Sequence, residues 1–515
     1  MNCRSSSRAL KVVKHCIRNQ IANFTRSTAA TTSSFDTVSN PSSPTSTEIG
    51  KPFQDIPRII SIPYFGSNWI YWPLVGRYDP DKPHHVARDI YKRYGKIVVE
   101  HLGGRYPLVR LFDANDIEIL YKSEGPTPFR IGSAAFKKYR SSRPQWYHNI
   151  GYLTMQGEEW YKYRSKTQPY TLKPRTIMSY VPSMNDVAEE ALQLIRNYQS
   201  KFGPGQWNCL RLLYKWSLES VLYVALDKRL RCMSTELPVG CDADRILKSM
   251  DMIFECLQIF GYRLPLWRYF RTPSWNNFEK AMDVFTEVIF RNIKEAQRTP
   301  NNDTQMTILQ HMLSRDDLLY EDIVALMSDF LLGGADTTSN TAAFLLYNMA
   351  IHPDAQDKAF EEVSRLMAGR ENNAVTFDDL NNIPFIKACL KESLRLFPSI
   401  TGVYRKFDKN VIMSGYHIPK GTVVFADFYI TGRNPLYFSS PEKFLPERWI
   451  SKTNNYHAYG SLPFSFGPRM CLGRRIAELE IWTLMIKVSC RNINGLSALP
   501  HTVHRTAPFI ICVYS

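Results

Sequence analysis

Cys471 stands at the end of a glycine-bearing loop in the order Phe464, Gly467, Arg469, Cys471, Gly473. A thiolate that binds iron needs positive surroundings and backbone N–H groups directed at the sulfur. Gly467 and Gly473 have no Cβ, so the main chain and a flat cofactor can approach closely. Arg469 could reach an anionic edge of that cofactor, and the helix expected after the loop adds a favourable dipole. Cys471 alone could be a buried structural cysteine, but the complete pattern favours a metal ligand.

A second segment, residues 320–350, carries reactive side chains inside a nearly continuous apolar helical pattern. At 1.5 Å per residue this helix would be roughly 45 Å long, enough to cross a large domain. Gly333 and Gly334 suit a helix that must deform or let a ligand lie against its backbone. Thr337 offers a hydroxyl for a carbonyl or a bound oxygen species, and Asp336 offers a proton. The residues alone leave open a glycine pair that ends a helix with a polar cap.

The pattern F-x-x-G-x-R-x-C-x-G at residues 464–473 resembles the heme-binding loop of the cytochrome P-450 superfamily. The resemblance implies that Cys471 ligates the iron of heme b (iron protoporphyrin IX), which activates dioxygen. The run from Gly333 to Thr338 is similar to the family's oxygen-binding motif, [AG]-G-x-D-T-[TS]. By that resemblance Thr337 holds water near the distal oxygen and Asp336 feeds protons toward it, which favours a monooxygenase.

Glu392 and Arg395 lie three residues apart, on one face of a predicted helix. The spacing alone is also compatible with an exposed ion pair that contributes less than about 1 kcal/mol. Together with Pro446-Glu447-Arg448-Trp449, the pair resembles the family's E-x-x-R and P-E-R-F arrangement, with Trp449 in place of the usual phenylalanine. The resemblance implies that Arg448 completes a buried charge network behind the cysteine loop.

Trp160 and Arg164 form a W-x-x-x-R pair that resembles the family's helix over a heme propionate. Arg405 matches a second propionate arginine, although a solvated arginine on a strand is an equally open interpretation of that residue. With Arg469, three guanidinium groups would face two carboxylates, an arrangement that suits the fork geometry of arginine.

The remaining pattern predicts a mainly α protein with small β-sheets. Helical periodicity dominates from about residue 157 to 370, for example in Asn185–Tyr198 and Phe278–Ala296. Short strand-like runs occur at 97–99, 108–111, 411–413 and 422–425. The resemblance implies the cytochrome P-450 fold, as a single large heme-binding domain over residues 55–515.

The first fifty residues differ from the rest of the chain. No acidic residue precedes Asp36, while six basic residues punctuate a Ser/Thr-rich run. This composition is typical of a mitochondrial transit peptide, which we expect at residues 1–35, with a flexible linker at 36–54. A disordered basic tail is the other interpretation. No apolar run approaches twenty residues, so no transmembrane helix is predicted.

Composition and charge constrain the partners. The ten cysteines contain no C-x-x-C pair, which favours a reducing compartment. The net charge is +16, but no basic block or zinc-finger spacing supports nucleic-acid binding. Lys387 and Lys391, four residues apart, could be an ordinary solvated helix surface. They also resemble the lysines with which the mitochondrial branch of animal P-450 proteins docks an acidic ferredoxin, and Arg474 and Arg475 would extend that patch.

The resemblance implies a heme-thiolate monooxygenase that hydroxylates a lipophilic substrate, with a sterol or steroid favoured by analogy within the mitochondrial branch. O2 and electrons from NADPH, relayed through ferredoxin reductase and an adrenodoxin-like ferredoxin, would drive it on the matrix side of the mitochondrial inner membrane. Peripheral membrane association through residues 254–270 is also expected. The alternatives are an isomerase or dehydratase without a redox partner, a xenobiotic-oxidising monooxygenase, and a non-catalytic heme sensor. Residues expected to line the substrate pocket lie at 125–150, 250–266, 326–337 and 398–404, among them Phe260, Phe330, Ile400 and Val403. A last substrate-facing turn is expected near Arg505–Phe509.

Overall fold

The structure is a computed structural model that describes residues 50–490, except 63–65, 72–75, 80–81, 103–105, 203–208, 235, 263–264, 299–305, 371 and 452–455. The predicted transit peptide at 1–35, the linker as far as residue 49 and the turn near Arg505–Phe509 lie outside these residues. The predicted fold class is correct, because most of the described elements are helices and the strands form two small sheets.

The helices and 3-10 helices are, in chain order, η2 Phe53–Asp55, η3 Asn68–Tyr71, α2 Pro83–Tyr94, α3 Ala114–Ser123, α4 Ala134–Ser141, α5 Gly157–Thr171, α6 Pro174–Met178, α7 Val181–Phe202, α8 Cys209–Leu226, α9 Asp242–Tyr262, η4 Leu266–Arg268, α10 Pro273–Arg298, α11 Ile308–Leu313, α12 Tyr320–Ala350, α13 Pro353–Met367, α14 Phe377–Asn381, α15 Pro384–Leu396, α16 Phe428–Thr431, η5 Pro446–Trp449 and α17 Arg474–Cys490. The strands are β1 Ile97–Leu102, β2 Tyr106–Leu111, β3 Gly402–Lys406, β4 Val411–Met413, β5 Tyr416–Ile418 and β6 Val423–Asp427.

Four strands form a mixed sheet in the order β1-β2-β6-β3. The pairs β1/β2 and β6/β3 are antiparallel, whereas β2 and β6 run parallel. The separate hairpin β4/β5 turns at Gly415, whose φ of 77° is in the left-handed region that glycine adopts without strain. All four predicted strand-like runs are therefore strands. The sheet holds Arg405 at the register position opposite Val424.

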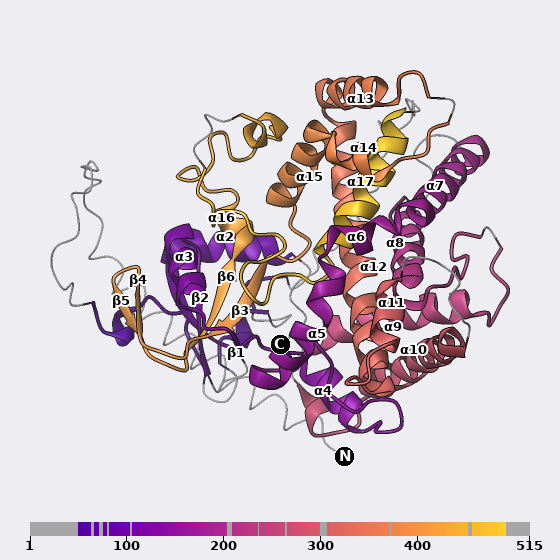
Figure 1. The fold of residues 1–515 in the computed structure, drawn as a ribbon. Helices are drawn as coiled ribbons and strands as arrows, with labels where there is room; N and C mark the ends of the chain where they lie inside the picture. Colours follow the sequence, from indigo (N-terminus) through magenta and orange to yellow (C-terminus); the bar gives the residue numbers. More distant parts are fainter. Residues whose placement is uncertain are drawn as a thin grey trace, which may run out of the picture. The chain divides into compact units, whose positions relative to one another are not determined.

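The long helix α12 runs through the helical part of the fold, beside α8 and α17 (Figure 1). Its bounds coincide with the predicted segment 320–350, and it continues unbroken through Gly333 and Gly334. The glycine pair therefore does not end the helix. A Cβ on Gly334 would lie 2.9 Å from a methyl carbon of Val221 on α8, whereas a Cβ on Gly333 would meet nothing within 4 Å. Gly334 therefore allows α12 to pack closely against α8, whereas Gly333 leaves space beside the backbone.

The starts of two helices, α3 and α15, follow local sequence signals. Asp113 caps α3, since its side chain accepts a hydrogen bond from the Asn115 N–H at 2.9 Å. Pro384 begins α15, the helix that carries Glu392 and the two lysines, because proline needs no N–H at a first helical position. None of the described helices is both long and apolar enough to cross a bilayer.

Candidate active site

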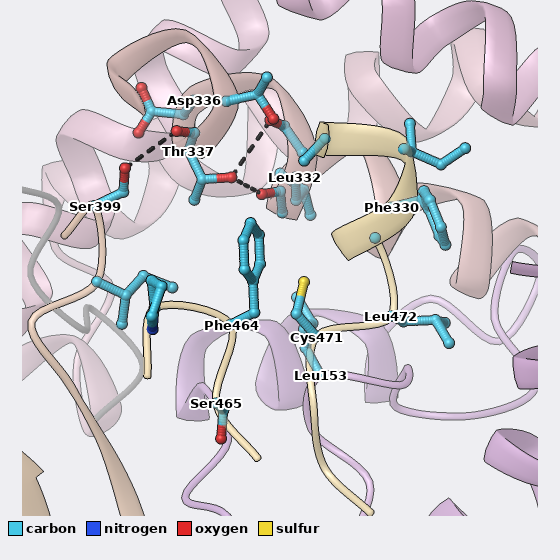
Figure 2. A pocket seen from close by; sticks show the side chains of 18 of the residues that line it. Leu153, Phe330, Leu332, Asp336, Thr337, Ser399, Phe464, Ser465, Cys471 and Leu472 are labelled. Carbon is cyan, nitrogen blue, oxygen red and sulfur yellow. Dashed lines mark hydrogen bonds between the residues drawn. The ribbon is translucent and has the colours of Figure 1, made fainter. Parts of the chain in front are cut away.

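The loop from Phe464 to Cys471 closes on itself before α17 begins. The Cys471 N–H donates to the Phe464 carbonyl at 2.9 Å, and the Met470 N–H donates to the Gly467 carbonyl at 3.0 Å. Gly467 has a φ of 73°, so a side chain there would strain the turn. Figure 2 shows the Cys471 sulfur and the Phe464 ring directed from this loop toward Thr337 on α12. The loop therefore presents its sulfur across a cavity to the predicted oxygen-binding segment.

Cys471 is exposed to this cavity and forms part of its wall. The cavity lies inside the protein, and this separation from bulk water raises the pKa of the Cys471 thiol, whereas a Gly473 N–H and the charges of Arg130 and Arg164 act to lower it. A thiol that coordinates a metal ion is deprotonated outright. The surroundings therefore fit a sulfur that becomes a thiolate when iron binds.

Arginine side chains gather beside the cysteine loop. Arg405 and Arg469 line the cavity with Arg130, and Arg164 is buried nearby. Burial, with repulsion from the other three arginines, lowers the pKa of Arg469 to about 9. Within the described part of the chain, neither Arg164 nor Arg469 forms an ion pair with a carboxylate. This end of the cavity is therefore suited to an anion.

Trp160 extends the same surface. The Arg469 guanidinium lies 3.9 Å from the centroid of the Trp160 ring. The buried Trp160 Nε1 meets no acceptor at hydrogen-bonding geometry among the described residues. An indole donor beside two guanidinium groups that have no carboxylate partner within the described chain fits the two propionates of heme, so the residues present are compatible with that cofactor.

Arg405 has a partner that the sequence did not predict. Its Nε lies 2.5 Å from Glu124 Oε1, and both side chains are buried. Its Nη2 donates to Ser465 Oγ at 3.2 Å. The open interpretation of Arg405 as a solvated strand residue is therefore wrong.

Two residues at this end of the cavity, Glu124 and Tyr152, were missed by sequence reasoning. Arg130 lies within the range 125–150 expected to line the pocket, but it was not singled out. Arg130 and Tyr152 line the cavity, and Arg164 donates to the Tyr152 hydroxyl. The sole sequence signal was the turn at Glu124-Gly125-Pro126 ahead of Arg130. That signal predicts a loop, but it does not indicate which side chains from other segments contact the loop.

The opposite wall is made by α12. The Thr337 hydroxyl donates to the Gly333 carbonyl at 2.7 Å, and Ser399 donates to the Thr337 carbonyl at 3.1 Å (Figure 2). Asp336 also lines the cavity. Burial raises the pKa of the Asp336 carboxyl to about 7, against the opposing effect of Asn340. A carboxyl group with this pKa can hold or release a proton near neutral pH.

The Glu392 carboxylate is the acceptor at the centre of a buried hydrogen-bond network. Arg395 donates to it from Nε at 2.9 Å and from Nη2 at 2.7 Å, and Arg448 Nε donates at 2.9 Å. The Trp449 indole N–H donates to Glu392 Oε2 at 2.9 Å. The tryptophan that departs from the family's phenylalanine therefore adds a hydrogen bond that phenylalanine could not make. The exposed ion pair considered for Glu392 and Arg395 is excluded, because both side chains are fully buried.

The four basic residues predicted for partner docking lie on two packed helices, α15 and α17. Lys391 is exposed and Lys387 is half-buried, and burial lowers the pKa of Lys387. Arg474 and Arg475 both contact Glu478, at 2.8 and 3.3 Å. One carboxylate therefore offsets part of the positive charge that the sequence predicted for this surface.

The cavity has about 1720 Å³ of empty space, including its opening to solvent. Phe330, Ile400 and Val403 line it, as predicted, together with Phe254 and Leu326. Phe260 is instead buried in an aromatic cluster, 4.7 Å from Trp267 and 5.5 Å from Phe278 between ring centroids. Its periodic position in α9 did not reveal which neighbour it faces.

The sequence profile of the cytochrome P450 family matches residues 62–488. The "Probable cytochrome P450 49a1" of Drosophila melanogaster is 32% identical over 85% of this chain and 77% of its own length. "Cytochrome P450 302a1, mitochondrial" of the same organism is 31% identical over 85% of this chain and 88% of its own. "Ecdysone 20-monooxygenase", also from that organism, is 28% identical over 84% of this chain and 82% of its own. The chain therefore belongs to the cytochrome P450 family, in its mitochondrial type, and is a monooxygenase whose cofactor is heme with a cysteine thiolate ligand.

Proposed function

We propose that Cys471 is the iron ligand and that the enzyme hydroxylates a lipophilic substrate, with electrons passed from NADPH through ferredoxin reductase and a ferredoxin. One observation carries the proposal: the Cys471 sulfur faces Thr337 across a cavity whose end is lined by arginines. Bound heme supplies the activation of dioxygen, and the protein supplies the ligand, the orientation and the protons.

The cofactor's carboxylates would lie against Trp160, Arg164 and Arg469, with Arg405 oriented by Glu124. Gly467 and Gly473 leave room for the main chain to pass close to the ring. The Phe464 side chain, which points into the cavity, would pack against the cofactor and exclude water from the sulfur side.

On α12, Asp336 would hold a proton near neutral pH on its carboxyl oxygen. The Thr337 Oγ1 donates to the Gly333 carbonyl, so its lone pairs remain available to accept a hydrogen bond from a water molecule. We infer that Asp336 would act as the proton source and that Thr337 would hold the water molecule that carries the proton into the cavity.

The substrate side of the proposal rests on the cavity wall. Phe254, Phe330, Ile400 and Val403 give it an apolar surface, which favours a hydrophobic molecule of sterol size. A relative named for action on ecdysone supports a steroid-like substrate. A xenobiotic-oxidising monooxygenase is the alternative that a substrate panel would distinguish.

Location and partner follow from separate observations. Several relatives bear mitochondrial names, and the N-terminal composition is that of a transit peptide, so we infer the matrix side of the inner membrane. The exposed Lys391 and the half-buried Lys387 support docking of an acidic ferredoxin. Leu266, Tyr269 and Phe270 are 51%, 70% and 66% exposed between α9 and α10, which supports peripheral membrane contact.

Two measurements test the proposal. The reduced, purified protein with carbon monoxide should show the thiolate-type absorption band, and Cys471→Ser should lose it. Cys241→Ser, at a half-buried cysteine that does not line the cavity, is the matched control and should keep the band. A band that survives Cys471→Ser would refute the ligand assignment.

Turnover should also require NADPH, ferredoxin reductase and ferredoxin together. Turnover of the heme-loaded protein without them would favour an isomerase or dehydratase. A full heme spectrum with no NADPH consumption across a sterol and xenobiotic panel would instead favour a ligand sensor.

A further inference from the structure

The wall of the cavity contains a buried ion pair that the chemistry described so far does not use. Asp329, on α12, lines the cavity and is 5% exposed. Its Oδ1 accepts a hydrogen bond from Arg140 Nη2 at 2.6 Å, and Arg140 is 1% exposed. The neighbouring lining residues Leu153, Leu326 and Phe330 are apolar. A charged pair thus stands in an otherwise hydrophobic part of the wall.

The surrounding chain is shaped to hold this pair. Arg140 Nη1 donates to the Ile150 carbonyl at 3.0 Å, and the Leu153 N–H donates to Asp329 Oδ2 at 2.9 Å. Gly151 has a φ of 85°, and a Cβ there would lie 1.4 Å from Arg140 Nη1 and 2.8 Å from Asp329 Oδ2. Only glycine therefore fits between the loop and the pair.

Stability gives a weak reason for such a pair. Replacing a buried ion pair by apolar residues of similar volume is often neutral or stabilising. The loop is also held to α12 at a second point, because Asp322 accepts from Asn149 Nδ2 at 2.6 Å and contacts His148 Nδ1 at 3.0 Å. Asp322 precedes Asp329 by seven residues, or two helical turns, and does not line the cavity. Holding the loop does not by itself require a charge on the cavity wall.

The unused capacity of Asp329 suggests what it binds. A carboxylate has about four acceptor positions, and Arg140 and the Leu153 N–H occupy two of them. A donor in the cavity could use the others. Because Arg140 already balances the charge, a neutral hydroxyl group fits better than an ammonium group.

We propose that Asp329, held by Arg140, is the specificity residue that accepts a hydrogen bond from a hydroxyl group on the substrate's end remote from the oxidised carbon. This inference rests on the proposed function. Asp329 precedes Thr337 by eight residues, a distance of about 12 Å along the helix. The substrate class is therefore an elongated, uncharged lipophile with a hydroxyl group about 12 Å from its reacting carbon.

A series of ligands of graded length tests the role of Asp329 in the full-length, heme-loaded protein. Alkylimidazoles bind heme iron through nitrogen, and each alkyl tether can be compared with its ω-hydroxy counterpart by the shift of the heme absorption band. The hydroxyl should tighten binding roughly tenfold or more at a tether of about ten carbons, because buried hydrogen bonds to charged groups are strong. At about four carbons it should give no gain.

The double variant Arg140→Met/Asp329→Leu removes both charges and should bind the unsubstituted alkylimidazole unchanged while losing the hydroxyl preference. Asp322→Asn, which loosens the same loop away from the cavity, should keep the preference. A wild-type series with no preference at any length overturns the inference, whether or not the double variant folds, as does a double variant that keeps the preference. A protein that takes up no heme would refute the proposed function instead, and so the two failures are distinguishable.

Discussion

Replacing Trp449 by phenylalanine should remove one hydrogen bond from a buried carboxylate while leaving its other contacts in place. The carboxylate is that of Glu392, which also accepts hydrogen bonds from Arg395, Arg448 and the Leu445 N–H. Trp449 Nε1 is the donor to Glu392 Oε2 at 2.9 Å, and Arg395 Nε shares that oxygen. The variant therefore weakens the network without breaking its charge balance.

The expected magnitude follows from that geometry. A hydrogen bond to a charged group contributes about 1.5–3 kcal/mol, and we expect Trp449→Phe to lower the free energy of unfolding by that amount. Glu392→Gln should cost more, roughly 3–5 kcal/mol, because it leaves Arg395 and Arg448 buried without a counter-charge. The predicted order of stability is wild type, then Trp449→Phe, then Glu392→Gln.

The assay is urea unfolding of the heme-loaded protein, followed by circular dichroism and by the heme absorption band. Trp482→Phe is the matched control. Trp482 is also half-buried with a lysine over its ring, Lys387 at 5.0 Å, as Lys391 lies 6.0 Å from the Trp449 ring. Its buried Nε1 has no acceptor among the described residues, so the control loses ring area but no hydrogen bond.

Equal destabilisation by Trp449→Phe and Trp482→Phe would show that the loss comes from packing alone. A Glu392→Gln variant no less stable than Trp449→Phe would refute the charge argument. Either result would remove the physical account of why tryptophan stands in the position where phenylalanine was expected.

Other residues give further predictions. Burial raises the pKa of Asp336 to about 7, so its carboxyl is protonated below that pH and charged above it. Wild-type turnover should therefore fall as the pH rises through about 7. The pH–rate profile of Asp336→Asn should lack this step. Arg469→Met should weaken heme retention roughly tenfold to a hundredfold by removing a charge-assisted contact, as measured by heme transfer to apomyoglobin. Lys391→Ala should raise the KM for ferredoxin with little change in kcat, and added salt should reduce the difference in KM between variant and wild type. The control variant Lys420→Ala, at an exposed position on the turn after β5, should leave both constants unchanged. Deleting residues 1–35 should abolish mitochondrial import of a fluorescent fusion in cells; continued import would contradict the transit-peptide assignment.

Local patterns in the sequence predicted four of the strands and several of the long helices. The bounds of α12 could be read from its apolar periodicity, and the loop around Cys471 from its glycines, because both signals lie within one short segment. The behaviour of Gly333 and Gly334 was less clear, since a glycine pair can end, bend or thin a helix. Val221, on another helix, determines that Gly334 serves close packing.

Contacts between distant segments could not be predicted in this way. Glu124 meets Arg405 across 281 residues of chain, and Arg140 meets Asp329 across 189. No sequence spacing predicts either pair. The sheet positions Arg405 beside Glu124, and the loop before α5 holds Arg140 and Asp329 together, only in the folded protein. Phe260 was assigned to the cavity for the same reason, since periodicity gives a buried face but not the neighbour behind it.

The arginine cluster links cofactor binding to folding. Arg164, Arg405 and Arg469 are buried at one end of the cavity, and Glu124 pairs with only one of them. A pKa near 9 for Arg469 means that the cofactor-free cavity opposes its charge, although an arginine ordinarily stays protonated far above that pH. A dianionic cofactor would relieve this opposition, and its binding free energy would add to the stability of the folded state. Arg469→Met should therefore weaken heme binding without stabilising the cofactor-free form, because Arg469 also donates to the Pro128 and Met155 carbonyls at 2.9 Å and the variant leaves both buried acceptors without their donor.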